Sequence, residues 1–402
     1  MPSSLKIMFY RLRSALTRKV LKPDAQPKPI TFIGPGSVQQ LCAAIAHFGL
    51  KKIFIVTDKP LVELGLIDGA KQALQDNGVA VVVYDGVLPD PTFQIIGEGL
   101  AALKASGCDG VMALGGGSSM DAAKIMALAA SNDVAPKDLV GLNKAKLPSL
   151  PFFAIPTTAG TGSEVTVAAV PSDDETHAKQ PIVDNKIVPA ACALDPSIMV
   201  GLPPHITSAT GMDALTHAIE SYIGNWGTPE TERLGSAAVK LIFQHLPIAY
   251  EEGGNLASRE AMALASYYAG LAFSKAMVGF VHAISHQLGS HYGIPHGLGN
   301  AVVLPHVLEY SKDEAQQKMA QLVVSVGLGQ VDEGEAALAQ KLIDKVVRLN
   351  GQVGIPRGFE QIKAEDITDL ATAACAEGNS YPVPKYMDVK DCSAILQGLM
   401  VQ

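Results

Sequence analysis

The chain has 402 residues, which is more than one compact core normally holds and suits two domains of ordinary size. Apolar residues make up 48% of the chain, and the formal net charge of −8 argues against a nucleic-acid-binding protein, whose domains are usually basic. Five cysteines without a C-x-x-C motif exclude a disulfide framework and a thiolate metal site, so we expect a reducing, cytoplasmic compartment.

Residues 1–28 form a basic N-terminal extension, with six Lys and Arg residues before the first acid, Asp24. Its apolar residues recur at roughly helical spacing and are Leu5, Met8, Phe9, Leu12, Leu16 and Val20. The segment lacks the continuous apolar core of a secretory signal. A surface helix docked on its own domain, an organelle-targeting peptide and a membrane-surface helix all agree with the pattern. The chain holds no run of about 18 apolar residues, so we expect no transmembrane helix.

Between residues 29 and 203, short apolar runs alternate with helical patterns. Strands are predicted at 51–58, 79–86, 110–117 and from residue 150, and helices at 69–78, 92–107 and 118–131. This alternation is typical of a parallel sheet with helices on both faces. Asp58 ends the first of these strands, where an acid can bind a ribose 2′-hydroxyl. A helix cap or a solvated surface acid explains Asp58 equally well.

Two loops that follow strands carry residues suited to a nucleotide. GGGSSMD (115–121) opens a helix, so its backbone amides and the helix dipole could hold a phosphate. It is not the G-x-G-x-x-G fingerprint, and an ordinary glycine-rich turn is the alternative. PTTAGTGSE (156–164) places Thr157, Thr158 and Thr161 among glycines. Their hydroxyls suit a sugar or a phosphate, and a hydroxyl-rich turn is the alternative.

After Pro203 and Pro204, long helical patterns replace the strands, and we place a domain boundary there. Within GMDALTHAIE (211–220), Asp213 and His217 lie four residues apart on one face of the predicted helix. That pair could bind one divalent metal, or its members could simply hydrogen-bond to each other.

Four of the chain's ten histidines lie in HAISHQLGSHYGIPHG (282–297). His282 and His286 share one helical face, whereas His291 points to the opposite side. Pro295 ends the helix, and a turn there could fold His296 back toward His282. Together with Asp213 and His217, the residues His282 and His296 would form a metal site of one carboxylate and three imidazoles.

These motifs resemble those of the iron-dependent (type III) alcohol dehydrogenases. The resemblance rests on GMDALTHAIESYI, VHAISHQLGSHYGIPHGLGNAVVLPH, ALGGGSSMDAAK and AIPTTAGTGSE, and it extends from about Pro29 to the C-terminus. It implies a Rossmann-like α/β dinucleotide-binding domain over residues 29–203 and an all-α metal-binding domain over residues 204–402. It also implies NAD as cofactor and a divalent metal, Fe(II) in the first place and Zn(II) as the alternative.

The resemblance also assigns roles to individual residues. His286 would lie beside the metal as a catalytic proton carrier, or it would only orient a ligand. The metal ligands would be Asp213, His217, His282 and His296. The NAD contacts would be Asp58, Asp90, Gly115, Gly116, Gly117, Ser118, Thr157, Thr158, Thr161, Val170 and Lys179.

The expected reaction transfers hydride between a small alcohol or aldehyde and NAD, in a homodimer or another homo-oligomer. A hydroxyacid–oxoacid transhydrogenase is the first alternative, and it would retain its cofactor and show little turnover with free NAD. A sugar-phosphate cyclase would need a glutamate in place of Asp213 and basic residues near the metal, so the sequence argues against it. A redox or metal sensor would bind NAD without turning over any alcohol.

Overall fold

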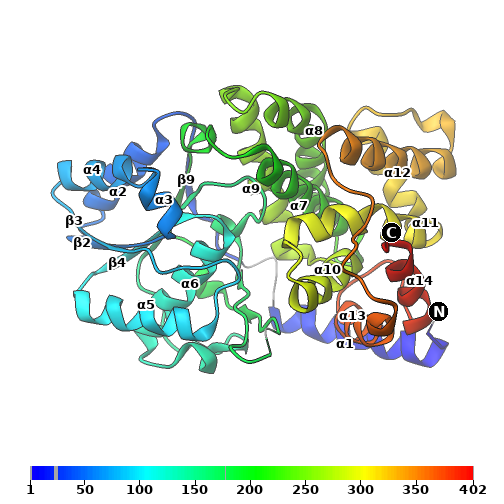
Figure 1. Cartoon of the computed structure of the whole chain (residues 1–402), viewed down its shortest axis with the longest axis horizontal. Helices are drawn as coiled ribbons and strands as arrows, with labels where there is room; N and C mark the ends of the chain where they lie inside the picture. The colour runs from blue at the N-terminus through cyan, green and yellow to red at the C-terminus, as the bar shows by residue number, and fades with distance from the viewer. Residues whose placement is uncertain (1, 22–25, 177, 402) are drawn as a thin grey trace. The chain divides into compact units, whose positions relative to one another are not determined.

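The computed structural model describes residues 2–21, 26–176 and 178–401 (Figure 1). Backbone contacts group the chain into two compact units that meet in the sequence between Leu202 and Pro203. The α/β unit comprises residues 26–202 and 254–267, and the helical unit comprises the described part of residues 1–25 with 203–253 and 268–402. Residues 2–21 of the basic extension thus group with the helical unit, and residues 254–267 group with the α/β unit.

A six-stranded, fully parallel sheet forms the centre of the α/β unit. The strands run in the order β1 (Ile30–Ile33), β9 (Ala191–Leu194), β6 (Phe152–Pro156), β4 (Gly110–Gly115), β2 (Lys52–Val56) and β3 (Ala80–Tyr84). The four predicted strands are all present, and the predicted parallel α/β fold is confirmed. The sequence did not reveal β1 and β9, because each has four residues and β9 (ACAL) lacks β-branched residues.

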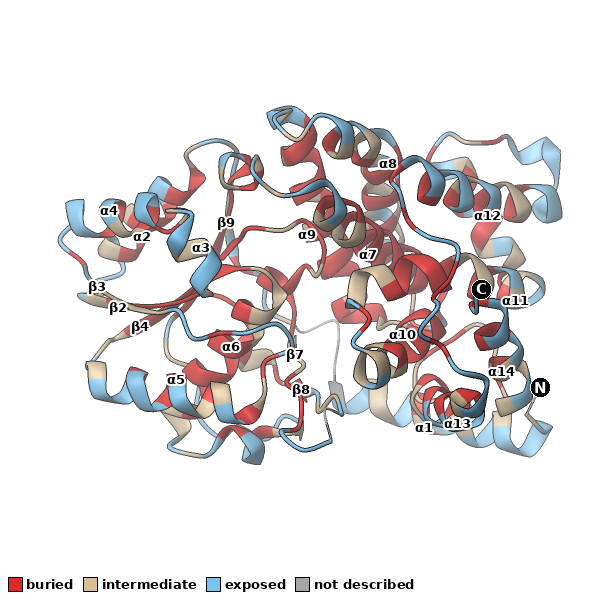
Figure 2. Ribbon diagram, in the orientation of Figure 1, coloured by how far each residue is buried: buried red, intermediate tan, exposed pale blue. Residues whose placement is uncertain are grey.

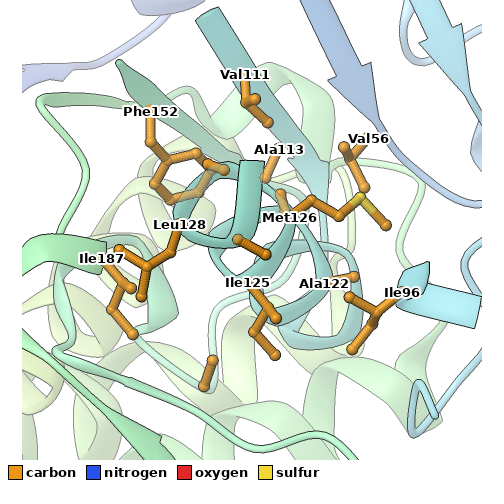
Figure 3. Packing of buried hydrophobic residues seen from close by; sticks show 14 of the residues in the cluster. Val56, Ile96, Val111, Ala113, Ala122, Ile125, Met126, Leu128, Phe152 and Ile187 are labelled. Carbon is orange, nitrogen blue, oxygen red and sulfur yellow. The ribbon is translucent and has the colours of Figure 1, made fainter. Parts of the chain in front are cut away.

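Helices cover both faces of this sheet (Figure 1). One face packs against α2 (Ser37–His47) and α4 (Asp68–Asp76), and the other against α5 (Phe93–Ser106) and α6 (Gly117–Asn132). Residues 122–129 of α6 are all buried, and Ile125, Met126 and Leu128 belong to the same apolar cluster as Val56 and Phe152 of the sheet (Figure 3). This core fixes the N-terminus of α6 directly after β4.

The strand order reverses between β2 and β4, since the chain runs from β2 to β3 on one side and from β4 to β6 on the other. In open parallel sheets, ligands bind at the carboxyl ends of the strands at such a reversal. Asp58 follows β2 there and begins α3 (Lys59–Glu63), while Gly115 ends β4. A methyl group on Gly115 would lie 3.5 Å from Leu61 of α3, so the two predicted nucleotide segments are neighbours.

In the helical unit, every described element is a helix, as predicted. The buried residues 211–223 make α7 the central helix, and Figure 2 shows it largely in red. The helices of this unit are α1 (Ser4–Leu21), α7 (Pro204–Ile223), α8 (Pro229–Glu251), α10 (Phe280–Tyr292), α11 (His296–Ser325), α12 (Glu335–Gln352), α13 (Ile367–Gly378) and α14 (Val389–Gly398). The helix α9 (Leu256–Ala276) begins in the α/β unit, where Tyr267 bonds to Thr31 over 2.8 Å, and ends in the helical unit.

Several short elements complete the two units. A small sheet consists of β5 (Gly141–Leu142), β8 (Ile182–Val183) and β7 (Ala168–Ala169). Short 3₁₀ helices are η2 (Pro136–Leu139), η3 (Ser163–Val165), η4 (Asn185–Ile187), η5 (Pro196–Met199), η6 (Val331–Glu333) and η7 (Ala364–Asp366). Over the described ranges, no individual helix has the length and apolar character needed to cross a membrane, although α9 and α10 would pass on both criteria if taken together as one bent pair.

Within the basic extension, Ser4–Leu21 form the helix α1, as the spacing predicts, and this helix docks on the helical unit. Ser14 is buried and accepts a hydrogen bond from Trp226 Nε1 over 2.9 Å. The ring of Tyr10 packs against the ring of Tyr386, with centroids 5.4 Å apart. The docked face is therefore not the apolar one, whose side chains remain exposed.

Candidate functional site

The four predicted metal ligands come together in the helical unit. One donor atom from each of Asp213, His217, His282 and His296 lies within 4.8 Å of the other three. The first two residues come from α7, the third from α10 and the fourth from the first turn of α11. The first three side chains are buried, whereas the side chain of His296 is 36% exposed. The cluster is thus built on packed helices and opens on the His296 side.

The turn between α10 and α11 places His296 beside His282, as the sequence predicts. Gly293 ends α10 with a φ of 67°, a left-handed conformation that glycine adopts without strain. Pro295 then precedes the first residue of α11. His291 lies away from the cluster, where its Nε2 is 3.2 Å from Asp366 Oδ2.

Polar atoms of three of the four residues face one nitrogen atom. The side-chain amide nitrogen of Asn300 donates to Asp213 Oδ1 over 2.7 Å, and it also lies 3.1 Å from His296 Nε2 and 3.2 Å from His282 Nε2. Three acceptors that face a single donor are arranged as the ligands of a cation are. One carboxylate and three imidazoles also match the ligand preferences of divalent iron and zinc. The residues present therefore suit a divalent metal.

A second carboxylate, Glu220, orients His282. Its Oε2 accepts from His282 Nδ1 over 2.6 Å and from the Gly279 amide over 2.8 Å, and its Oε1 accepts from the Val281 amide over 2.7 Å. Burial raises the pKa of Glu220 to about 7, while the amide donors favour its ionised form. Burial and the neighbouring imidazoles hold the pKa of His282 well below its ordinary value. His282 is therefore neutral, with Nε2 available as a ligand.

We expect Glu220→Gln to weaken the binding of a divalent metal by about 10- to 100-fold, the usual effect of losing a partner that orients a ligand. The glutamine amide would face the Gly279, Val281 and His282 donors with one acceptor instead of two. Competition with a chelator of known affinity measures the change. Glu309→Gln, at an exposed glutamate, is the matched control. Equal metal affinity in both variants would remove Glu220 from the site.

His286 lies next to the four donors without being one of them. Its ring stacks on that of His296 with centroids 5.2 Å apart, and its Nδ1 lies 2.6 Å from Glu377 Oε1. Glu377 also accepts from the Tyr381 hydroxyl over 2.8 Å and from Gln287 Nε2 over 3.0 Å. Although burial raises the pKa of Glu377, His286, Tyr381 and His296 together hold it below the ordinary value. An ionised carboxylate thus holds His286 in one orientation.

Sequence reasoning missed Glu220, Asn300 and Glu377. A signal existed for two of them, because Glu220 lies three residues after His217 and Asn300 lies four residues after His296, on the faces that carry the ligands. Glu377 is 91 residues from its partner His286, and no local pattern connects the two.

In the α/β unit, the two predicted nucleotide loops lie against each other. Gly116 is the N-cap residue of α6. No side chain caps this end of the helix, which begins at Gly117 and Ser118. A methyl group on Gly117 would approach Thr161 Cγ2 to 2.7 Å, and one on Gly116 would lie 3.6 Å from Thr158. A side chain at position 117 would therefore have to displace Thr161, which favours glycine there.

Two residues of α6 that the sequence did not single out, the half-buried Asp121 and the buried Lys124, hold the threonine loop in place. Asp121 accepts from Ser163 Oγ and from the Val170 amide, each over 2.8 Å. Lys124 Nζ donates to Thr166 Oγ1 over 2.8 Å and to Ser163 Oγ over 2.9 Å. Burial lowers the pKa of Lys124 to about 8. The predicted contact residue Val170 thus owes its position to Asp121.

The remaining predicted contacts lie at the same end of the sheet. Asp58 caps α3 by accepting from the Leu61 amide over 3.0 Å, so the helix-cap alternative is present in the structure. Asp90 pairs with Lys179, whose Nζ lies 2.5 Å from its Oδ1. Lys179 also donates to Ser172 Oγ over 3.1 Å. Asp90 and Lys179 are therefore an ion pair, and the two predicted NAD contacts lie next to each other.

Comparison with known proteins covers almost the whole chain. The family model "Iron-containing alcohol dehydrogenase" matches residues 28–196, and the model "Fe-containing alcohol dehydrogenase family, C-terminal" matches residues 207–400. The helix α1 lies outside both ranges.

Individual relatives agree with the family models. An NAD-dependent methanol dehydrogenase of Bacillus methanolicus is 37% identical over 92% of this chain and 98% of its own length. A lactaldehyde reductase of Escherichia coli K12 is 37% identical over 87% of this chain and 93% of its own length. The crystal structure of a 1,3-propanediol oxidoreductase superposes with a TM-score of 0.90 and 36% identity, over 93% of this chain and 99% of that one. The chain therefore belongs to the iron-containing alcohol dehydrogenase family of oxidoreductases.

Proposed function

We propose that the chain is an alcohol dehydrogenase that also reduces aldehydes, with NAD as hydride carrier and a divalent metal at Asp213, His217, His282 and His296. The convergence of these four donors within 4.8 Å carries the proposal. A bound divalent metal supplies Lewis acidity toward an alcohol or aldehyde oxygen. In this proposal, residues 204–402 bind the metal and residues 29–203 bind the dinucleotide.

The chain's own residues would orient the reactants and move the proton. Glu220 fixes His282, and Asn300 connects three of the four ligand side chains. We propose that His286 accepts the proton that an alcohol releases on oxidation, because Glu377 holds its Nδ1–H and leaves Nε2 as the acceptor. The alternative is that His286 only orients a neighbouring ligand.

The proposed NAD contacts follow the two adjoining loops. The pyrophosphate would lie against Gly115, Gly116, Gly117 and Ser118 at the N-terminus of α6. The nicotinamide side would face Thr157, Thr158, Thr161, Val170 and Lys179, and the adenine ribose would face Asp58 with Asp90 close by. The contact between Gly117 and Thr161 supports a single site made by both loops.

We expect the unaltered protein to prefer NAD over NADP, because a 2′-phosphate would lie close to the Asp58 carboxylate. Removing that charge should relax the preference by about 10- to 1,000-fold, the range for like charges near 4 Å. Asp58→Gly removes both the charge and the cap, whereas Asp58→Asn keeps a capping oxygen and isolates the charge. The ratio of kcat/KM for the two cofactors measures the effect, with the exposed Asp85→Asn as control. Equal kcat/KM values in the unaltered protein would contradict the role of Asp58.

We propose Fe(II) as the metal. Zn(II) is the alternative, because the same ligands bind zinc more tightly than ferrous iron. The decisive experiment reloads the metal-free protein anaerobically with iron, zinc, nickel or manganese. It then assays short alcohols, diols and aldehydes, including methanol, 1,3-propanediol and lactaldehyde, with NAD or NADH. Metal-dependent turnover is the expected result, and none with any pair would overturn the proposal. Turnover that needs an oxo-acid acceptor instead of free NAD would identify a transhydrogenase.

We further propose a cytoplasmic homo-oligomer, in the first place a dimer. All five cysteines are free thiols, which agrees with a reducing compartment. The edge strand β1 leaves Ile30 and Ile33 exposed, and an unpaired strand edge is a surface to which a second copy can add. Light scattering on the purified protein determines the oligomeric state.

A further inference from the structure

The helix α1 exposes a continuous apolar stripe. The six side chains in the stripe are 55–71% exposed, and they are Leu5, Met8, Phe9, Leu12, Leu16 and Val20. Steps of three and four residues place them along one side of the helix. Exposed apolar residues in such a contiguous row mark a surface that contacts another apolar phase or partner.

The stripe points away from the helical unit. The docked face carries Tyr10, Ser14 and Arg18, whose guanidinium lies 5.9 Å from the centre of the Trp226 ring. Leu12 and Leu16 each lie two residues from Ser14, or about 200° around the helix axis. The apolar residues are thus available while α1 stays docked, and no unfolding is needed to expose them.

Basic residues flank the stripe on both sides. Lys6 lies at one edge and Arg11 at the other, Lys19 lies within the stripe near its C-terminal end, and all three are exposed. Residues 1–22 hold six of the chain's 31 Lys and Arg residues and none of its 39 Asp and Glu residues. A helix with one apolar face, a phenylalanine in that face and basic flanks has the composition of helices that lie in the interface of an anionic membrane.

We propose that α1 docks the protein on an anionic lipid leaflet, with the apolar stripe among the acyl chains and the flanking cations at the phosphates. Charge complementarity favours this occupant over a second copy of the helix, since two stripes face to face would bring their basic flanks together. The stripe runs along an 18-residue helix, which is about 27 Å at 1.5 Å per residue. This inference does not depend on the proposed reaction.

Flotation of the full-length protein with vesicles tests the proposal. One set of vesicles contains phosphatidylcholine and phosphatidylglycerol in equal parts, and the other contains phosphatidylcholine alone. We expect binding to the first set only, and salt should weaken it. Replacing Lys6, Arg11 and Lys19 together by Gln should weaken binding by about 100-fold, at roughly fivefold for each cation. Phe9→Glu combined with Leu12→Glu should abolish binding.

Two controls keep the test specific. Val331→Glu introduces the same charge at a valine of the helical unit that is 78% exposed, and it should bind as the unaltered protein does. Alcohol turnover in solution should be unchanged in all of these variants, which shows that they fold. Failure of the unaltered protein to bind, or equal binding by the Phe9/Leu12 variant, would overturn the proposal. A change of oligomeric state in that variant, without vesicle binding by the unaltered protein, would assign the stripe to a second copy instead.

Discussion

His282→Ala is expected to remove the bound divalent metal and to lower alcohol oxidation by about 10³-fold or more. Three imidazoles and a carboxylate would become two imidazoles and a carboxylate, and the Glu220 carboxylate would lose the ring that it orients. Loss of Lewis acidity amounts to several kcal/mol of transition-state stabilisation, and each 1.36 kcal/mol is tenfold in rate. Metal content by elemental analysis and kcat/KM with saturating NAD measure the two losses.

The comparison variant for this experiment is His291→Ala, because His291 lies in the same helix but pairs with Asp366 away from the cluster. It should keep its metal and its activity. NAD binding should survive in both variants, since the proposed NAD contacts all lie in the α/β unit. Circular dichroism shows whether the alanine variant is folded. A folded His282→Ala protein with stoichiometric metal would show that the site has been placed wrongly.

His286→Ala should keep its metal and its NAD affinity but lose about 10²-fold or more in alcohol oxidation, the usual loss when a general base is removed. The reason is geometric, because His286 lies beside the four donors and is held by Glu377 without being one of them. The shape of the kcat profile against pH should change as well. Metal content and the pH–rate profile of this one variant provide both measurements.

Glu377→Gln separates the two possible roles of His286. It leaves the imidazole in place but removes the ionised partner of Nδ1, so a proton-carrying His286 should become slower while the metal content stays normal. If His286 only orients a ligand, both variants should instead bind metal more weakly and should recover kcat at high metal concentration. Normal metal content with an unchanged pH profile in His286→Ala would leave that residue with neither role.

The sequence predicts the fold well where an element carries its own periodic pattern. The strand at Lys52–Val56 and the helix at Phe93–Ser106 both lie within the ranges that their apolar residues predict. The edge strand β1 and the alanine-rich β9 carry no such pattern, because β1 depends on pairing with β9, and β9 on pairing with β1 and β6. The basic extension shows the opposite problem. Its apolar spacing predicts the helix but does not show that Tyr10, Ser14 and Arg18 make the docked face.

In the candidate site, too, local spacing predicts some residues, whereas others are brought in only by tertiary packing. The spacing of Asp213, His217 and His282 within two helices brings the donors onto shared faces, and the turn at Pro295 adds His296. The partners of these residues come from farther away. Glu377 reaches His286 through the packing of α13 against α10, and that contact cannot be read from either segment alone.

Two of the four donors, Asp213 and His217, lie on a stretch of α7 that is buried without interruption from Gly211 to Ile223. In native proteins, backbone amides in such a segment exchange their hydrogens only when the whole cooperative unit opens, whereas frayed ends and loops exchange through small local openings. Consequently, no local opening of low free energy can change the distance between Asp213 and His217. Heat or denaturant would separate the pair in the same event that unfolds the helical unit, so the lifetime of the donor geometry equals the lifetime of that unit.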